Sequence, residues 1–261
     1  MKKLVALMCA LFIAIPAWSQ SYDEAESLWE GRGENVVKAL EASDMYKALS
    51  NVEAAGSYEQ AEALLLQTET LFFYADASSN IDLKKKYHGL GEKIALRAGG
   101  MFKNLGDDEN LALSYFWAGA HLGKWGLANG VLASLFKVKK LMKHIDVIKN
   151  AGGQELMSYG YNRLLGRLFF KLPWPKGDKK EALRLAKEGY ENTINEDFGV
   201  SEHGLNNIYY AEYLIQSGNK AEAKRILNLF VAITNYEDFN SERMPETKIE
   251  QATARKLLNN L

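Results

Sequence analysis

Apolar residues recur along the chain at spacings of three and four positions, the pattern of helices that bury one face. Glycine, Asn and Asp separate the segments that carry this pattern, and no sustained alternation of Val, Ile and Thr marks a strand. The prolines stand at positions 16, 173, 175 and 245, so residues 17–172 contain none. Because proline is strongly excluded from helix interiors, the pattern predicts an all-α protein.

The predicted helices are of similar length and follow one another through short turns. Asp107 or Asp108 can cap one of them, Asp178 can cap another, and Pro245 suits a first helical turn. We expect helices over 23–31, 35–54, 58–75, 82–104, 107–129, 131–150 and 154–171, one that starts at Asp178, two over 203–217 and 219–233, and a last one from Met244 onward.

The spacing of small and large residues in the second half is typical of a tetratricopeptide repeat. The clearest unit contains Ala211, Leu214, Gly218, Ala223 and Leu227. A second unit runs from LGRLF (165–169) to Ala182, and GSYEQAEALL (56–65) offers a weaker third. Small residues let paired helices approach, and large ones fill the space between pairs. We therefore expect an all-α, tetratricopeptide-like antiparallel helical array, an α-α superhelix.

The N-terminus has the layout of a secretory signal peptide. A basic start is followed by LVALMCALFIAI, which is too short to anchor the chain across a membrane, and then by Pro16 and the small residues of AWS. We expect cleavage after Ser19, so that 1–19 is a signal peptide and 20–261 a single helical-repeat domain. That domain is expected to be exported and periplasmic, soluble after cleavage and without a stable membrane anchor. Cys9 does not fit a lipoprotein signal.

Cysteine and charge exclude several classes. Cys9 is the one cysteine, so the domain expected at 20–261 has no disulfide, cysteine-based zinc site or cysteine nucleophile. Without Lys2 and Lys3, 32 − 2 = 30 basic residues stand against 33 acidic ones, a net charge near −3. That balance does not support nucleic-acid binding.

The stretch YFWAGAHLGKWG (115–126) carries the strongest candidate site. Trp117, His121 and Trp125 are four apart and lie along one face of a helix. One interpretation is a groove lined by indoles and an imidazole, suited to an apolar or aromatic ligand. The other is ordinary packing between paired helices.

Three glycines interrupt the same helix, at positions 119, 123 and 126. Together they cost roughly 3 kcal/mol relative to alanine, so either a close helix contact or a ligand must compensate. We expect His121 and Trp125 to line a groove or central cavity, and Trp117 to pack more deeply.

Basic residues supply two further candidates. Arg163, Arg167 and Lys171 are also four apart and could bind a carboxylate or phosphate, although such a row is often a solvated face. Arg167 is the charge expected near the mouth of the groove. The run KVKKLMKH (137–144) is consistent with membrane-surface contact or with a solvated face. Trp174, in the stiff segment PWP, either caps the core or rims the groove.

Catalysis finds little support in the sequence. The histidines are far apart and none has metal-ligand spacing, and no nucleophile elbow, P-loop or dinucleotide fingerprint is present. We expect no enzyme, no catalytic residue, no metal and no cofactor.

One part of the chain resembles a known family. From ALSYFWAGAHLGKWG through the basic helix to LGRL…LP and GD..KA (residues 112–191), order and spacing are similar to the centre of the T-component proteins of TRAP transporters. More distantly, it resembles the helical domain of the regulators of microtubule dynamics. The residues that carry the likeness are Trp117, Leu122, Gly123, Trp125, Lys137 to Lys143, Leu165 to Pro173 and Gly177 to Ala182. Many T-components are lipoproteins, and this sequence departs from them there.

The resemblance implies a periplasmic helical-repeat protein that works beside a solute-binding protein. The leading hypothesis is therefore an exported, non-catalytic protein that binds a protein partner, an accessory component of a periplasmic solute-binding or transport system. The alternative is a binder or carrier of a small apolar or anionic ligand in an aromatic-lined groove. The candidate binding residues are Trp117, His121, Trp125, Arg163, Arg167 and Trp174.

Overall fold

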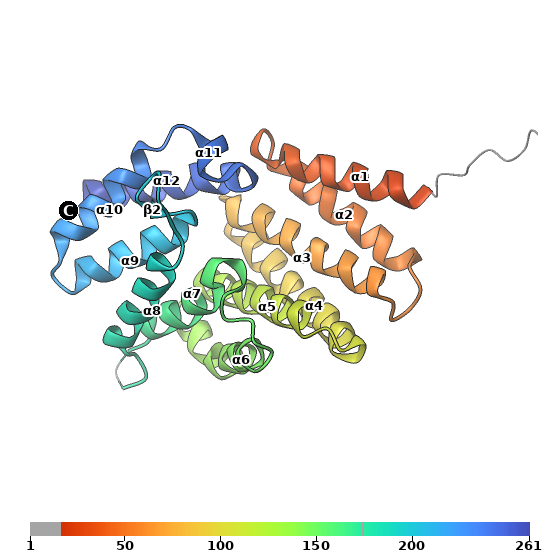
Figure 1. The fold of residues 1–261 in the computed structure, drawn as a ribbon. Helices are drawn as coiled ribbons and strands as arrows, with labels where there is room; N and C mark the ends of the chain where they lie inside the picture. The colour runs from red at the N-terminus through yellow and green to blue at the C-terminus, as the bar shows by residue number, and fades with distance from the viewer. Residues whose placement is uncertain (1–16, 174) are drawn as a thin grey trace, which may run out of the picture.

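The computed structural model describes residues 17–173 and 175–261, and in this part the chain is almost entirely helical (Figure 1). The α-helices are α1 (Ala17–Glu30), α2 (Val37–Val52), α3 (Tyr58–Ala77), α4 (Ile81–Leu105), α5 (Asp108–Asn129), α6 (Val131–Asn150), α7 (Leu156–Lys171), α8 (Lys179–Glu191), α9 (Gly204–Gln216), α10 (Lys220–Ala232), α11 (Tyr236–Asn240) and α12 (Met244–Asn259). Two 3-10 turns, η1 (Gly31–Gly33) and η2 (Ser241–Arg243), and two short strands, β1 (Ile194–Asn195) and β2 (Val200–Ser201), complete the chain.

The predicted all-α antiparallel array is confirmed. The sequence pattern did not predict α11 or the two-residue antiparallel ladder of β1 and β2. Most of the expected signal peptide, 1–19, lies outside the described residues, but α1 begins within it, at Ala17.

The sequence signals for helix ends act as expected. The Asp107 side chain accepts a hydrogen bond from the backbone N–H of Asn110 at 2.9 Å, and Asp178 does the same for Glu181 at 2.9 Å. Pro245 lies in the first turn of α12. Gly106 ends α4 with φ +74°, a backbone conformation that favours glycine.

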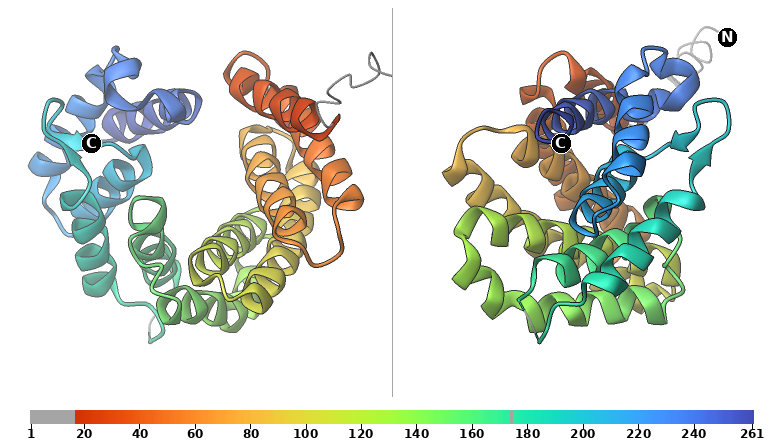
Figure 2. Two further views of the ribbon diagram at one scale, coloured as in Figure 1. Left: turned by 45° about the vertical axis from the view of Figure 1, so that its right-hand side comes forward. Right: turned by 90° about the vertical axis from the view of Figure 1, so that its left-hand side faces the viewer.

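The helices form two arms with separate hydrophobic cores. One core joins α3, α4 and α5 around buried side chains such as Phe102 and Phe116, and a smaller cluster ties α1 and α2 to α3. The other core joins α8, α9, α10 and α12 around Ile226 and Phe230. In Figure 2 the two arms face each other across a central space, and α6 and α7 connect them on one side.

On the opposite side, the two ends of the array meet through Arg32 of η1. Its guanidinium binds both carboxylate oxygens of Glu246 on α12, at 3.0 and 3.1 Å, and donates to the carbonyl of Glu242. It also stacks on the Trp29 ring, 3.9 Å from the centroid. The side chains of Arg32 and Glu246 are only 7% and 19% exposed. This bidentate contact, which we call the clasp, converts the arch into a closed ring.

Breaking the clasp should destabilise the protein and open the ring. We expect Arg32→Ala to cost about 2–3 kcal/mol, less than the roughly 3–5 kcal/mol of a fully buried pair, because Glu246 keeps some contact with solvent. Urea unfolding measures this cost, and small-angle scattering should show a larger radius of gyration. The control is Arg184→Ala, whose ion pairs with Glu181 and Glu188 are exposed, with a loss below about 1 kcal/mol. Equal effects of the two substitutions would show that the clasp stabilises the protein no more than an exposed ion pair does.

Candidate ligand-binding cavity

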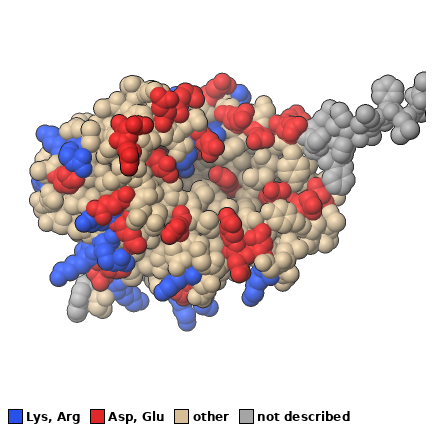
Figure 3. Space-filling model, viewed as in Figure 1, with Lys and Arg blue, Asp and Glu red and all other residues tan. Residues whose placement is uncertain are grey.

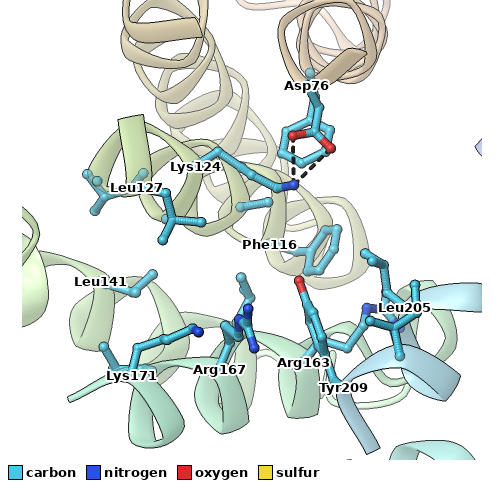
Figure 4. A pocket seen from close by; sticks show the side chains of 18 of the residues that line it. Asp76, Phe116, Lys124, Leu127, Leu141, Arg163, Arg167, Lys171, Leu205 and Tyr209 are labelled. Carbon is cyan, nitrogen blue, oxygen red and sulfur yellow. Dashed lines mark hydrogen bonds and ion pairs between the residues drawn. The ribbon is translucent and has the colours of Figure 1, made fainter. Parts of the chain in front are cut away.

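The two arms enclose a cavity of about 740 Å³. Its walls come from both arms and from the helices that connect them, and most of the wall is apolar. Phe72, Phe116, Leu141, Leu205 and Ile208 contribute to it. The volume lies within the range of about 300–1,000 Å³ that is typical of small-ligand pockets. Figure 4 shows the interior: charged side chains from α3 and α5 on one side face those of α7 across the open space.

One face of α5 forms a long wall of the cavity. Phe116, Ala120, Gly123 and Leu127 follow at spacings of three and four, so they share this face. A Cβ atom on Gly123 would meet nothing within 4 Å, so this glycine leaves the space open.

The other two glycines of α5 allow close contacts between helices. A Cβ on Gly119 would lie 3.0 Å from Leu164 of α7, and one on Gly126 would lie 2.9 Å from Ser134 of α6. Gly119 and Gly126 therefore allow close packing of helices, and Gly123 leaves space in the cavity. Both explanations that the sequence offered for these glycines apply.

Lys124 places a cation inside the cavity. Its ammonium binds both carboxylate oxygens of Asp76 on α3, at 2.6 and 2.8 Å. Burial by itself would raise the pKa of Asp76, but the charge of Lys124 outweighs it, and the pKa is lowered. Burial would likewise lower the pKa of Lys124, but the carboxylate of Asp76 raises it. Both groups are therefore charged at neutral pH.

The facing wall is basic and belongs to α7. Arg167 forms an ion pair with Glu212 of α9, and Lys171 lies 3.3 Å from the same carboxylate. The Arg167 guanidinium also lies over the Tyr209 ring, 4.6 Å from its centroid. In Figure 4 the Tyr209 hydroxyl points into the space between the two walls.

Arg163, one turn earlier on α7, is buried and holds an unusual backbone segment. Met157, Ser158 and Tyr159 form a left-handed turn with φ of 54°, 51° and 64°, which costs on the order of 3–6 kcal/mol for three non-glycine residues. Arg163 donates to the carbonyls of Met157 and Ser158 and to Asn206 Oδ1. Burial and the nearby Arg243 lower the pKa of Arg163 to about 9, so it remains a cation at neutral pH.

Acidic groups gather at the clasp end of the cavity. Glu69, Glu246 and Glu250 line it there together with Arg243. Burial raises the pKa of Glu69 and of Glu250 to about 7 in each case. The cavity is therefore polarised, with its excess of cations along α7 and α5 and its carboxylates near α12.

Three of the six candidate binding residues line this cavity, Trp117, Arg163 and Arg167, and so does Lys171 of the same basic row. Trp117 is 7% exposed and packs against Phe72 and Phe116, as expected of the deeper tryptophan. Trp174 lies outside the described residues. Whether any of these residues binds a ligand stays a prediction.

The prediction that His121 and Trp125 line the cavity is wrong in its geometry. Their face of α5 is turned toward α3 and α4, because each step of four residues rotates away from the cavity-lining positions. Trp125 packs beside Gly89 of α4 and under the ammonium of Lys137, 5.2 Å from the ring centroid. His121 is 0% exposed and fits against Gly91, where a Cβ would overlap its ring.

Buried His121 forms a pair with His88 that fixes the protons of both rings. His121 Nε2 lies 3.1 Å from the carbonyl of Thr68 and must donate to it. Its Nδ1 is then the acceptor for the Nδ1–H of His88, at 3.1 Å. Desolvation, together with the neighbouring imidazole, lowers the pKa of His88 to about 3, and desolvation lowers that of His121 to about 4. The pair is a neutral part of the core.

Several cavity residues had not been recognised from the sequence, and Lys124 is the main one. The sequence did contain a signal for it, because Lys124 is the only Lys, Arg, Asp or Glu in residues 111–136. A lone charge in a long apolar helix must find a partner or a polar cavity. Asp76, Tyr209 and Glu212 stand on helices far away in sequence and carried no such signal.

The fold and the site define a class: a ring of paired helices with a polarised interior cavity. The sequence matches no model of a known protein family, and the comparison with curated proteins found no match. Within the described residues, no helix is both long and apolar enough to cross a membrane. In the same part of the chain, His, Cys, Asp and Glu side chains form no group of three that could hold a metal ion.

The two tryptophans of α5 should differ in their effect on stability. We expect Trp117→Ala to cost about 3–5 kcal/mol, as for a large buried aromatic residue, and Trp125→Ala to cost clearly less because its ring is only partly buried. Chemical denaturation of both variants measures the difference. Equal losses would mean that Trp125 is as much a core residue as Trp117.

The histidine pair should make stability depend on pH. Because both pKa values are depressed in the folded state, the unfolded chain binds more protons between about pH 6.5 and pH 4. Stability should therefore fall with decreasing pH in that window, by up to roughly 1.4 kcal/mol per pH unit for each histidine. Glu69 and Glu250 have the opposite effect, since their raised pKa values favour the folded state as the pH falls.

A comparison with the His88→Gln variant separates the two contributions, because the carboxylates are common to both proteins. The variant's free energy of unfolding should change less steeply between pH 6.5 and pH 4 than that of the wild type. Parallel pH profiles would contradict a neutral buried pair.

Proposed function

We propose that the protein is a binding protein that holds a small amphipathic molecule, an apolar body with one anionic group, in the cavity between its arms. The observation that carries this proposal is the combination of about 740 Å³ of mostly apolar space with a row of cations along one wall. Pockets that hold small ligands measure about 300–1,000 Å³, and this cavity falls within that range.

The charges on the two facing walls favour an anion. Lys124 on α5 and Arg163, Arg167 and Lys171 on α7 supply four positive charges, and the carboxylates of Asp76 and Glu212 that pair with them supply two negative ones. Among the described residues Arg163 contacts only neutral acceptors, and no carboxylate neutralises it directly. A ligand carboxylate, sulfonate or phosphate near α7 would supply the missing negative charge.

The surrounding structure supports binding without large rearrangement. The cations are already held by Asp76, Glu212 and the left-handed turn, so few side chains have to be ordered when a ligand enters. Tyr209 adds a hydroxyl directed into the space, as Figure 4 shows. Such fixed polar groups in an apolar cavity select the orientation of a ligand.

For the wider role of the protein, the proposal follows the resemblance to the T-components. We propose an exported, non-catalytic protein that works beside a periplasmic solute-binding protein, with the ligand shared between the two. Export, the partner and the absence of catalysis stay predictions.

A matched pair of fluorescent probes tests the cavity. Anilinonaphthalene sulfonate has an aromatic body with a sulfonate, and N-phenylnaphthylamine has the same body without the charge. We expect both to bind, and Arg167→Gln to weaken the sulfonate probe by about tenfold or more while changing the neutral probe little, because a charge-assisted hydrogen bond is lost. Arg184→Gln, on the outside of α8, is the control.

A second substitution reduces the free volume of the cavity and leaves the fold intact. Gly123→Leu fills open space in a helix, so the variant should be as stable as the wild type or slightly more so. It should weaken both probes. Probe binding that is unchanged in Gly123→Leu would show that the probes bind elsewhere, and the proposal would then be wrong.

A further inference from the structure

The outer face of α6 exposes large apolar side chains. Phe136 is 86% exposed and Leu132 75% exposed, and Leu135 beside them is also exposed. Spacings of three and four place these residues on one side of the helix, opposite the buried Leu141 and Ile145. Exposed apolar residues are ordinary when single, but a contiguous group at the start of one helix indicates an interaction surface.

Lysines continue the same face. Lys139 and Lys143 are exposed and follow Phe136 along the helix. The stripe from Leu132 to Lys143 spans about 16 Å at 1.5 Å per residue. We call the residues Leu132, Leu135, Phe136, Lys139 and Lys143 the α6 stripe.

The α6 stripe belongs to a basic region of a chain that is slightly acidic overall. Residues 131–150 contain five lysines and one aspartate, whereas the whole sequence has a formal net charge of −1. In Figure 3 the Lys and Arg side chains gather along the lower edge of the molecule, the side where Figure 1 places α6, and acidic side chains spread over the rest of this face. An anionic surface would therefore attract the side of the molecule that carries α6 and repel the acidic face.

We infer that the α6 stripe docks on the surface of an anionic lipid bilayer. Leu132 and Phe136 would enter the interface, and Lys139 and Lys143 would bind lipid phosphates. This order of apolar and basic residues along one helix face matches a bilayer, which is apolar beneath a layer of negative headgroups. A protein partner would need an apolar pocket and an acidic patch at the same spacing.

Docking in this way would bring the cavity close to the bilayer. Leu127, Leu135 and Lys137, at the corner between α5 and α6, also line the cavity. The inference stands on the α6 stripe alone and holds whether or not the cavity binds a ligand.

Vesicle binding tests the inference with the whole protein. We expect co-sedimentation with vesicles of phosphatidylcholine and phosphatidylglycerol, weaker binding at high salt, and weaker binding to phosphatidylcholine alone. Lys139→Glu with Lys143→Glu should reduce the apparent affinity for the anionic vesicles by about tenfold or more. The control is Lys220→Glu with Lys224→Glu on α10, an exposed pair with the same spacing and charge change, which should have a much smaller effect.

The apolar half of the stripe has its own test. Leu132→Gln with Phe136→Gln should weaken vesicle binding while its salt dependence persists, and Val52→Gln with Leu90→Gln, at exposed apolar positions elsewhere, should not. All variants share one N-terminus, so the apolar run at 4–15 contributes equally to each. Circular dichroism confirms that the variants are folded.

Two outcomes would overturn the inference. One is that the α6 variants bind anionic vesicles as tightly as the wild type. The other is that the wild type ignores vesicles but self-associates in sedimentation, and that Leu132→Gln with Phe136→Gln abolishes the association. The stripe would then be an interface between copies of the chain.

Discussion

The clasp between Arg32 and Glu246 makes this helical array a closed ring and not an open arch. Paired helices that contact only their neighbours form a curved strip with a concave face open to water. Here the two ends of the strip meet through a bidentate ion pair, stacked on Trp29 and shielded from solvent. The concave face therefore becomes an interior. The separate cores of the two arms explain why that interior is not filled, since each arm has already buried its own apolar side chains.

The interior is arranged so that its charges are held before any ligand arrives. Asp76 of α3 holds Lys124 of α5 in place. Glu212 of α9 does the same for Arg167 of α7. Each pair keeps its cation in place, and the surrounding apolar wall strengthens the field that such cations exert. Arg163 combines two tasks, because the same guanidinium that faces the cavity also satisfies the carbonyls of a left-handed turn.

Much of the fold could be predicted from the sequence, because the signals for it are local. Proline-free apolar periodicity, the caps at Asp107 and Asp178, and the small residues of the repeats each act within one helix or one helix pair. The cavity depends on contacts between distant segments, and the sequence could not show which face of α5 would turn inward. The stripe of Trp117, His121 and Trp125 was chosen for its aromatic rings, but only Trp117 lines the cavity, and the other two side chains face α3 and α4.

The basic row on α7 was recognised because its residues repeat every four positions, and that row does face the cavity. Glu212, the acidic partner of this row, was not recognised, and neither was the clasp. No pattern in the sequence links residues so far apart. The left-handed turn at Met157–Tyr159 was missed for another reason. Its sequence contains no glycine, the residue that usually marks such a backbone.

The separate cores of the arms also bear on how the chain folds. Most contacts of each arm are between helices that follow one another, so each arm can assemble from local encounters, which are fast. The clasp joins residues 214 positions apart in sequence, and the entropy of closing so long a loop is recovered only after both arms exist. During synthesis the N-terminal arm can therefore be complete well before α12 leaves the ribosome. A chain that stops short of α12 would keep much of its helix content but have no enclosed interior, so the capacity to hold a ligand is acquired at the last step of folding.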